Sequence, residues 1–231
     1  MAVWLFLRNF AEQFRNTMAK NKVWQDDYWL LIMQLYLKKP VGMKPLYCRD
    51  MVDLSMELHI PPQQLRQRML QVSRLETPRI ERIWQRYSSQ PKLLARAVRL
   101  LRNMKGFGAA SEFYEGVEVQ ETFEKDFQPI SSESALTPVM LILVLNLYFQ
   151  LTPSTMVSQT PEVQQLARML KLKSDDVVEL LGIFQCCDPY LSRTGVVFSP
   201  LLVPCKQVWQ RFANTPEELE TLAEELKAYF S

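Results

Sequence analysis

The residues Ile83-Trp-Gln-Arg-Tyr87 recur 125 positions later as Val208-Trp-Gln-Arg-Phe212. A proline follows both stretches at the same spacing, as Pro91 and Pro216. Nearer the N-terminus, four leucines and a tyrosine repeat at an offset of 112: Leu31 with Leu143, Leu35 with Leu147, Tyr36 with Tyr148, Leu54 with Leu166 and Leu58 with Leu170. Similarity at fixed offsets indicates a repeated structural unit. The sequence therefore predicts a tandem duplication whose second copy carries an insertion between about 185 and 205.

The duplication predicts four segments along the chain. They are an N-terminal helical extension (1–24), a first repeat (25–105), an acidic and aromatic connecting arm (106–136) and a second repeat (137–231). The arm alternates glutamates with aromatic residues. That pattern is typical of an acidic segment lying on a basic neighbour, and the first repeat is such a neighbour.

Both repeats read as a series of helices. In the first repeat we expect helices over 27–37, 49–59 and 61–72, and another that begins near Pro91. In the second we expect them over 138–151, 161–171 and 175–184, with the last beginning near Pro216. Thr137, Ser174 and Thr215 are predicted N-caps. Residues 189–198 read as a short hairpin. The predicted fold is mostly α, with at most short β-hairpins.

Composition excludes several functional classes. The chain is 48% hydrophobic and 23% charged, which is ordinary for a soluble globular protein. Its six glycines offer little for phosphate-binding loops, and one histidine and four cysteines without a CxxC pair give no zinc pattern. We therefore expect no enzyme activity, no cofactor, no metal and no small-molecule substrate.

The most apolar stretch is too short for a membrane span. It covers 139–151, whereas about 20 apolar residues are needed to cross a bilayer. The apolar run at the start of the chain is shorter than that of a typical signal peptide, and no small-residue cleavage site follows it. The sequence predicts a cytoplasmic protein that does not enter a membrane.

The net charge of +2 is the sum of two opposite halves. Residues 1–105 hold 19 Lys and Arg against 8 Asp and Glu, a net charge of +11. Residues 106–231 hold 8 against 17, a net charge of −9. Each half projects its own field, so the first half is suited to an anionic partner.

Two of the predicted helices in each repeat are joined by a tight turn. In the second repeat they form the stretch 163–181, with Ala167 in the first helix, an apolar Leu172 in the turn and a β-branched Val177 in the second helix. This pattern resembles the helix-turn-helix and winged-helix family. The first repeat departs from it, since Ser55 replaces the alanine and Pro61 and Pro62 open the second helix.

The resemblance implies that the second helix of the pair enters the major groove of DNA. In the first repeat it implies a set of nucleic-acid-binding candidates rich in glutamine and arginine: Gln63, Gln64, Arg66, Gln67, Arg68, Gln71 and Arg74, continued by Arg79, Arg82 and Arg86. Such side chains can read base edges and neutralise phosphate. In the second repeat the same helix carries Asp175, Asp176 and Glu179, which repel phosphate.

Two functions from different classes follow. The first is a non-enzymatic protein-interaction or scaffold role, with a protein partner or self-association, since arginine and glutamine are also ordinary exposed helix residues. The alternative is a nucleic-acid-binding protein of the transcription-regulator kind that contacts DNA through the basic helix of the first repeat.

Overall fold

The computed structural model describes residues 24–104, 107, 123–132, 134–191 and 199–231. Every regular element in these ranges is a helix, which confirms the prediction of a mostly α protein. The predicted N-terminal extension falls outside the described ranges except for Trp24. Most of the predicted hairpin, over 192–198, and the arm over 108–122 also lie outside them.

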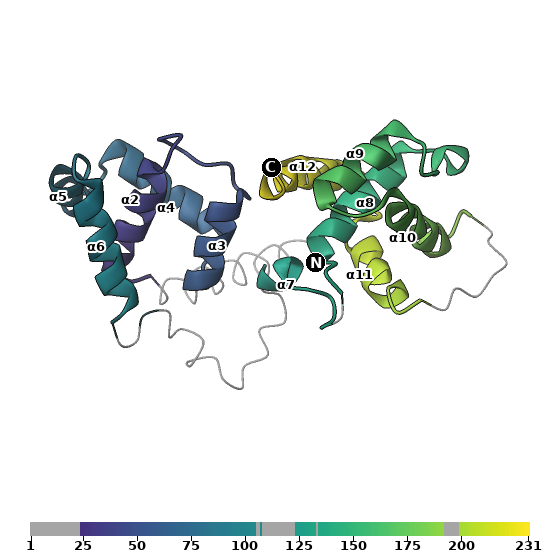
Figure 1. The fold of residues 1–231 in the computed structure, drawn as a ribbon, viewed down its shortest axis with the longest axis horizontal. Helices are drawn as coiled ribbons and strands as arrows, with labels where there is room; N and C mark the ends of the chain where they lie inside the picture. Colours follow the sequence, from purple (N-terminus) through teal and green to yellow (C-terminus); the bar gives the residue numbers. More distant parts are fainter. Residues whose placement is uncertain (1–23, 105–106, 108–122, 133, 192–198) are drawn as a thin grey trace, which may run out of the picture. The chain divides into compact units, whose positions relative to one another are not determined.

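The described chain divides into two compact units (Figure 1). The first contains the described residues up to Lys44 and continues from Asp53 through the last helix before the arm. The second contains 45–52 and everything from the described end of the arm to Ser231. The unit boundary therefore falls inside helix α3 (Arg49–Leu58), most of which lies in the first unit.

In the first unit the core is built on α2. Its helices and short 3₁₀ segment are η1 (Asp26–Tyr28), α2 (Trp29–Leu37), α3 (Arg49–Leu58), α4 (Pro62–Arg74), α5 (Pro78–Tyr87) and α6 (Pro91–Arg102). Helix α2 packs against α4, α5 and α6. Its Leu31, Ile32 and Met33 are almost fully buried. Helix α2 carries no charged residue, and a helix that is apolar on most sides is stable only when other elements cover it.

The second unit is arranged around α8. Its elements are α7 (Glu124–Phe127), α8 (Pro138–Gln150), η3 (Pro153–Thr155), α9 (Pro161–Leu170), α10 (Ser174–Cys187), α11 (Leu202–Phe212), α12 (Pro216–Leu226) and η4 (Lys227–Tyr229). Helix α8 packs against α7, α9, α10, α11 and α12 (Figure 1). A helix that is apolar on nearly all sides belongs in such a central place.

Prolines mark where most helices begin. Six of them stand in the first turn: Pro62, Pro78, Pro91, Pro138, Pro161 and Pro216. Proline lacks an N–H, and the first helical N–H groups have no intrahelical partner, so nothing is lost at this position. These prolines explain why the predicted helix starts lie close to the observed ones.

The helices of the two units match at the offsets read from the sequence. Helix α9 lies 112 residues after α3 at both ends, and α10 begins 112 residues after α4. Helix α12 begins 125 residues after α6. Pairs of matched leucines are buried in both units, such as Leu31 with Leu143 and Leu94 with Leu219.

The matched aromatic residues make the same contact. The rings of Tyr36 and Trp84 in the first unit lie 5.9 Å apart at 69°. Those of Tyr148 and Trp209 in the second unit lie 5.6 Å apart at 73°. Edge-to-face packing of this kind is favourable for aromatic pairs. The sequence match therefore coincides with a match in packing.

Candidate nucleic-acid interface

The turn between α3 and α4 sets the position of the candidate helix. His59 ends α3 in the left-handed conformation, with φ 54°, and the Ile60 N–H donates to the Ser55 carbonyl at 3.1 Å. In the second unit Lys171 has φ 57°, and the Leu172 N–H donates to the Ala167 carbonyl at 2.9 Å. A left-handed residue followed by this bond is a common helix ending. Each residue lies 112 positions from its counterpart, so the two turns are alike.

Four of the predicted residues on α4 are exposed to solvent. They are Gln63, Arg66, Gln67 and Arg74, whereas Leu65, Met69 and Val72 on the opposite side are buried. The spacing of three, four and seven residues puts the exposed side chains on one side of the helix. Helix α4 carries no acidic residue, and Arg66 makes no ion pair within the described residues. Gln64 and Gln71 are half-buried at the edges of this face.

Arg68 is held against the body of the first unit. Its guanidinium carbon lies 4.6 Å from the ring centroid of Trp24 and 5.6 Å from that of Trp29. Its Nη1 also donates to Oε1 of Gln71 at 3.2 Å. Cation–π contacts of this kind hold a guanidinium in place. Arg68 therefore packs α4 against the tryptophans of the first unit, and its guanidinium is less available to a ligand in solvent.

Arg79 is neutralised within its own unit. Its two terminal nitrogens lie 3.2 Å from carboxylate oxygens of Asp26 and Asp27, which form η1. Arg74 has one carboxylate near it, that of Glu76 at 3.5 Å, and the Arg74 side chain is 64% exposed. Exposed ion pairs contribute little and exchange readily for another anion. The Arg79 pairs are exposed as well, so both arginines stay available to another anion, although Arg79 has two carboxylates near it and Arg74 has one.

Arg82 and Arg86 extend the positive charge along α5. Both are exposed, and neither forms an ion pair within the described residues. The Nε of Arg82 donates to the Pro78 carbonyl one turn earlier, and the Arg86 guanidinium lies over the Tyr87 ring. Their charges face solvent.

Helix α6 adds cations that the sequence pattern did not single out. Lys92, Arg96 and Arg99 are exposed, and α6 contains no acidic residue. The sequence could have indicated these cations, because residues 91–102 contain basic residues and no acidic one. Arg102 at its end forms a two-pronged pair with Glu57 of α3, with Nε–Oε1 2.5 Å and Nη2–Oε2 2.7 Å.

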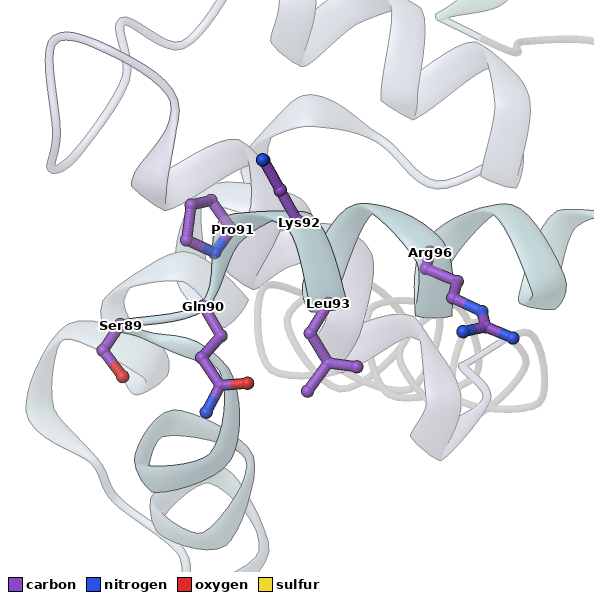
Figure 2. A pocket seen from close by; sticks show the side chains of 6 residues that line it. All are labelled: Ser89, Gln90, Pro91, Lys92, Leu93 and Arg96. Atoms are coloured by element: carbon purple, nitrogen blue, oxygen red, sulfur yellow. The ribbon is translucent and has the colours of Figure 1, made fainter.

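A shallow, open pocket lies where α5 turns into α6 (Figure 2). It is lined by Ser89, Gln90, Pro91, Lys92, Leu93 and Arg96. In Figure 2 the Gln90 and Leu93 side chains point to one side of the chain and Lys92 points to the other. The lining combines cations with apolar atoms and contains no carboxylate.

The corresponding face of the second unit is acidic. Asp175, Asp176 and Glu179 are exposed on α10, at the places that Gln63, Gln64 and Gln67 occupy on α4. Two of them serve local structure. The Asp176 carboxylate accepts from the Lys173 N–H at 3.1 Å, and the Asp175 carboxylate accepts from the Ser158 hydroxyl.

The described end of the connecting arm is tied to the second unit. Within that unit α7 packs on α8, and the Asp126 carboxylate accepts from Nη1 of Arg211 at 2.8 Å. The remainder of the predicted acidic arm lies outside the described residues, so its predicted place on the first repeat stays a prediction.

The cysteines form no disulfide, and no group of three or more His, Cys, Asp or Glu in the described residues could hold a metal ion. Burial, with a smaller effect of nearby Cys187, raises the pKa of the Cys205 thiol to about 12. Cys205 is therefore a neutral, unreactive thiol near neutral pH. Within the same ranges, no helix has the length and apolar character needed to cross a bilayer.

Comparison with protein-family models, with curated proteins and with solved structures finds no match to this chain.

Proposed function

We propose that the chain is a non-enzymatic binding protein made of two related helix-turn-helix-like units, and that its first unit binds nucleic acid. The observation that carries the proposal is the exposed side of α4, where Gln63, Arg66, Gln67 and Arg74 face solvent on a helix without acidic residues. Arginine neutralises phosphate, and both residue types can bond base edges.

The relation between the two units rests on three agreements. The helix bounds correspond at the two sequence offsets, the turns after α3 and α9 share a left-handed residue and the same backbone bond, and the tyrosine–tryptophan contacts are alike. Unrelated helices would meet one of these conditions by chance more readily than all three. Duplication followed by divergence of surface charge accounts for them together.

The functional division between the units follows from charge. Residues 62–104 contain nine Arg and one Lys against two Glu, whereas the α10 and α12 surfaces of the second unit are rich in exposed carboxylates. A carboxylate beside a phosphate is repelled, so the second unit is unsuited to the same ligand. We assign nucleic-acid contact to the first unit alone.

The test is binding of a labelled DNA duplex of about 20 base pairs, two helical turns, measured by fluorescence anisotropy across a salt series. Association through phosphates should weaken steeply between about 50 and 200 mM salt. Replacing Arg66 and Arg74 with alanine should reduce the slope of log K against log salt by about 0.9 for each phosphate that is no longer neutralised.

The matched control is Arg168→Ala, since Arg168 is an exposed arginine on α9 of the second unit. This variant should bind the duplex like the original protein. Absence of binding at low salt, or an equal loss from Arg168→Ala, would show that the face on α4 is not the site.

A protein-interaction role is the second candidate function. It is favoured by exposed apolar side chains at the end of α6 and just beyond it, a surface that nucleic acid would not select. Leu100 is 58% exposed and Met104 is 59% exposed.

A further inference from the structure

Helix α6 has two apolar sides, and one of them is in solvent. Leu94, Val98 and Leu101 are buried against the first unit. Leu93, Leu100 and, just past the helix end, Met104 are 36, 58 and 59% exposed. The exposed three are separated by seven and then four residues, which places them along one line on a helix surface. Large apolar side chains grouped in this way are characteristic of a protein contact.

Cations lie on α6 to one side of this line, with Arg96 nearest to it and Lys92 and Arg99 further round the helix. Lys92, Arg96 and Arg99 are exposed on α6, no carboxylate lies on the helix, and the pocket of Figure 2 brings Leu93 and Arg96 into one lining. We refer to these six residues, Leu93, Leu100, Met104, Lys92, Arg96 and Arg99, as the α6 face. Its partner must supply carboxylates and an apolar surface, because apolar side chains gain nothing beside a sugar-phosphate backbone.

The chain itself contains a helix that supplies the carboxylates, together with one half-buried leucine. Helix α12 exposes five glutamates, Glu217, Glu218, Glu220, Glu224 and Glu225, and its Leu222 is half-buried. It has no basic residue, and the nearest one, Lys227, bonds to Glu224. We refer to the five glutamates and Leu222 as the α12 face.

The α6 face and the α12 face carry opposite charges at two pairs of positions that match in the sequence. At the offset of 125, Lys92 corresponds to Glu217 and Arg99 to Glu224. Because α6 and α12 occupy the same place in their respective units, each face lies on a helix of similar length and similar burial. Like-charged copies of either face would repel each other, whereas the α6 face and the α12 face attract.

We propose that the α6 face of one chain docks on the α12 face of a second copy. The contact is heterologous, since it joins two different surfaces, and each added chain leaves one face of each kind open. Burial of Leu93, Leu100 and Met104 adds to the affinity, since each exposed ion pair contributes little by itself. The charges select the partner and make association sensitive to salt.

The experiment is sedimentation velocity on the full chain over a wide range of protein concentration at low salt. The original protein should sediment faster as its concentration rises. One variant inverts the basic side with Lys92→Glu, Arg96→Glu and Arg99→Glu; the other inverts the acidic side with Glu217→Lys, Glu220→Lys and Glu224→Lys. Each variant alone should lose about tenfold or more in association constant.

Mixing supplies the decisive result. The first variant carries two acidic faces and the second carries two basic faces, so an equimolar mixture should regain association that neither shows alone. Leu100→Gln should weaken association at every salt concentration, since it removes apolar contact without changing charge. All substituted positions are exposed, and circular dichroism checks that helix content is retained.

The matched control inverts Arg82 and Arg86 on α5, which are exposed cations of the same unit outside the α6 face. This variant should associate like the original protein. A chain that remains monomeric at every concentration, association that survives both inversions, or a mixture that does not reassociate overturns the proposal. None of these results depends on whether the protein binds DNA.

Discussion

Single side chains distinguish the two units at positions that match in the sequence. Tyr148 and Tyr36 hold matched positions and make matched ring contacts, yet only the Tyr148 hydroxyl donates to a carboxylate, that of Asp188 at 2.7 Å. Within the described residues the Tyr36 hydroxyl has no hydrogen bond. The repeat predicts the ring packing, whereas this hydrogen bond depends on Asp188 in the segment that follows α10.

This difference gives a paired prediction. Tyr148→Phe should lower the free energy of unfolding by about 1 kcal/mol, because it removes a half-buried hydrogen bond to a charged acceptor. Tyr36→Phe should change it by less than about 0.5 kcal/mol, since substitutions that remove no hydrogen bond and leave the ring in place usually have effects that small. Urea unfolding monitored by circular dichroism measures both, and equal losses would show that the Asp188 bond adds no stability.

Cys205 predicts a pH dependence of stability. Burial raises its pKa from the ordinary value of 9.0 to about 12, so between these values the unfolded chain loses a proton that the folded chain keeps. Stability from this group is present below about pH 9 and is lost as the pH rises, by up to about 1.4 kcal/mol per pH unit. Cys205→Ala should show a shallower decline above this pH than the original protein in urea unfolding. Parallel declines would assign the loss to other groups.

Helix ends show how far local sequence rules reach. Proline predicted the starts of several helices because its effect is confined to its own residue. Of the three predicted caps, Thr137 and Thr215 stand at the N-cap positions of α8 and α12, but neither side chain makes a cap bond. The prediction for Ser174 is wrong, because Ser174 lies inside α10 and Asp176 satisfies the Lys173 N–H instead. Thr215 has ψ 62°, outside the extended range that a capping side chain needs, whereas Thr77 at ψ 150° caps Ile80.

The left-handed turn after α9 yields a prediction for that element. Lys171 adopts φ 57° with a side chain that disfavours this conformation, so Lys171→Gly should raise stability by up to about 1 kcal/mol. Gln165→Gly, at an exposed position within α9, should lower it by about 1 kcal/mol, because glycine is unfavourable inside a helix. Thermal unfolding compares the two, and a loss from both would contradict the assigned turn geometry.

Across the whole molecule, the sequence predicts where the charged residues lie better than it predicts which of them are held by partners within the fold. The sequence alone separates a basic half from an acidic half, and it selects α4 as the helix with exposed glutamine and arginine. It does not show that Trp24 and Trp29 hold Arg68, or that Asp26 and Asp27 neutralise Arg79. Those partners lie tens of residues away, and only the packing of α4 and α5 around α2 brings them near.

Correspondence between the two units predicts that binding can be transferred from one to the other. If the units are copies, the residues of α4 should function when placed on α10 at an offset of 112. We expect the triple change Val178→Arg, Glu179→Gln and Cys186→Arg, which reproduces Arg66, Gln67 and Arg74, to create a second nucleic-acid site. Asp176 is left unchanged because it holds the start of α10.

Stoichiometry measures the outcome. Titration of the labelled duplex at low salt should give one binding site for the original protein and a second, weaker one for the triple variant, since Asp175 remains as a local repulsive charge. In a background carrying Arg66→Ala and Arg74→Ala, the transferred residues should restore part of the affinity. If the triple variant folds and gains no binding in either background, the exposed residues of α4 do not suffice to form the site. Helix α5 or the turn before α4 must then contribute to binding as well.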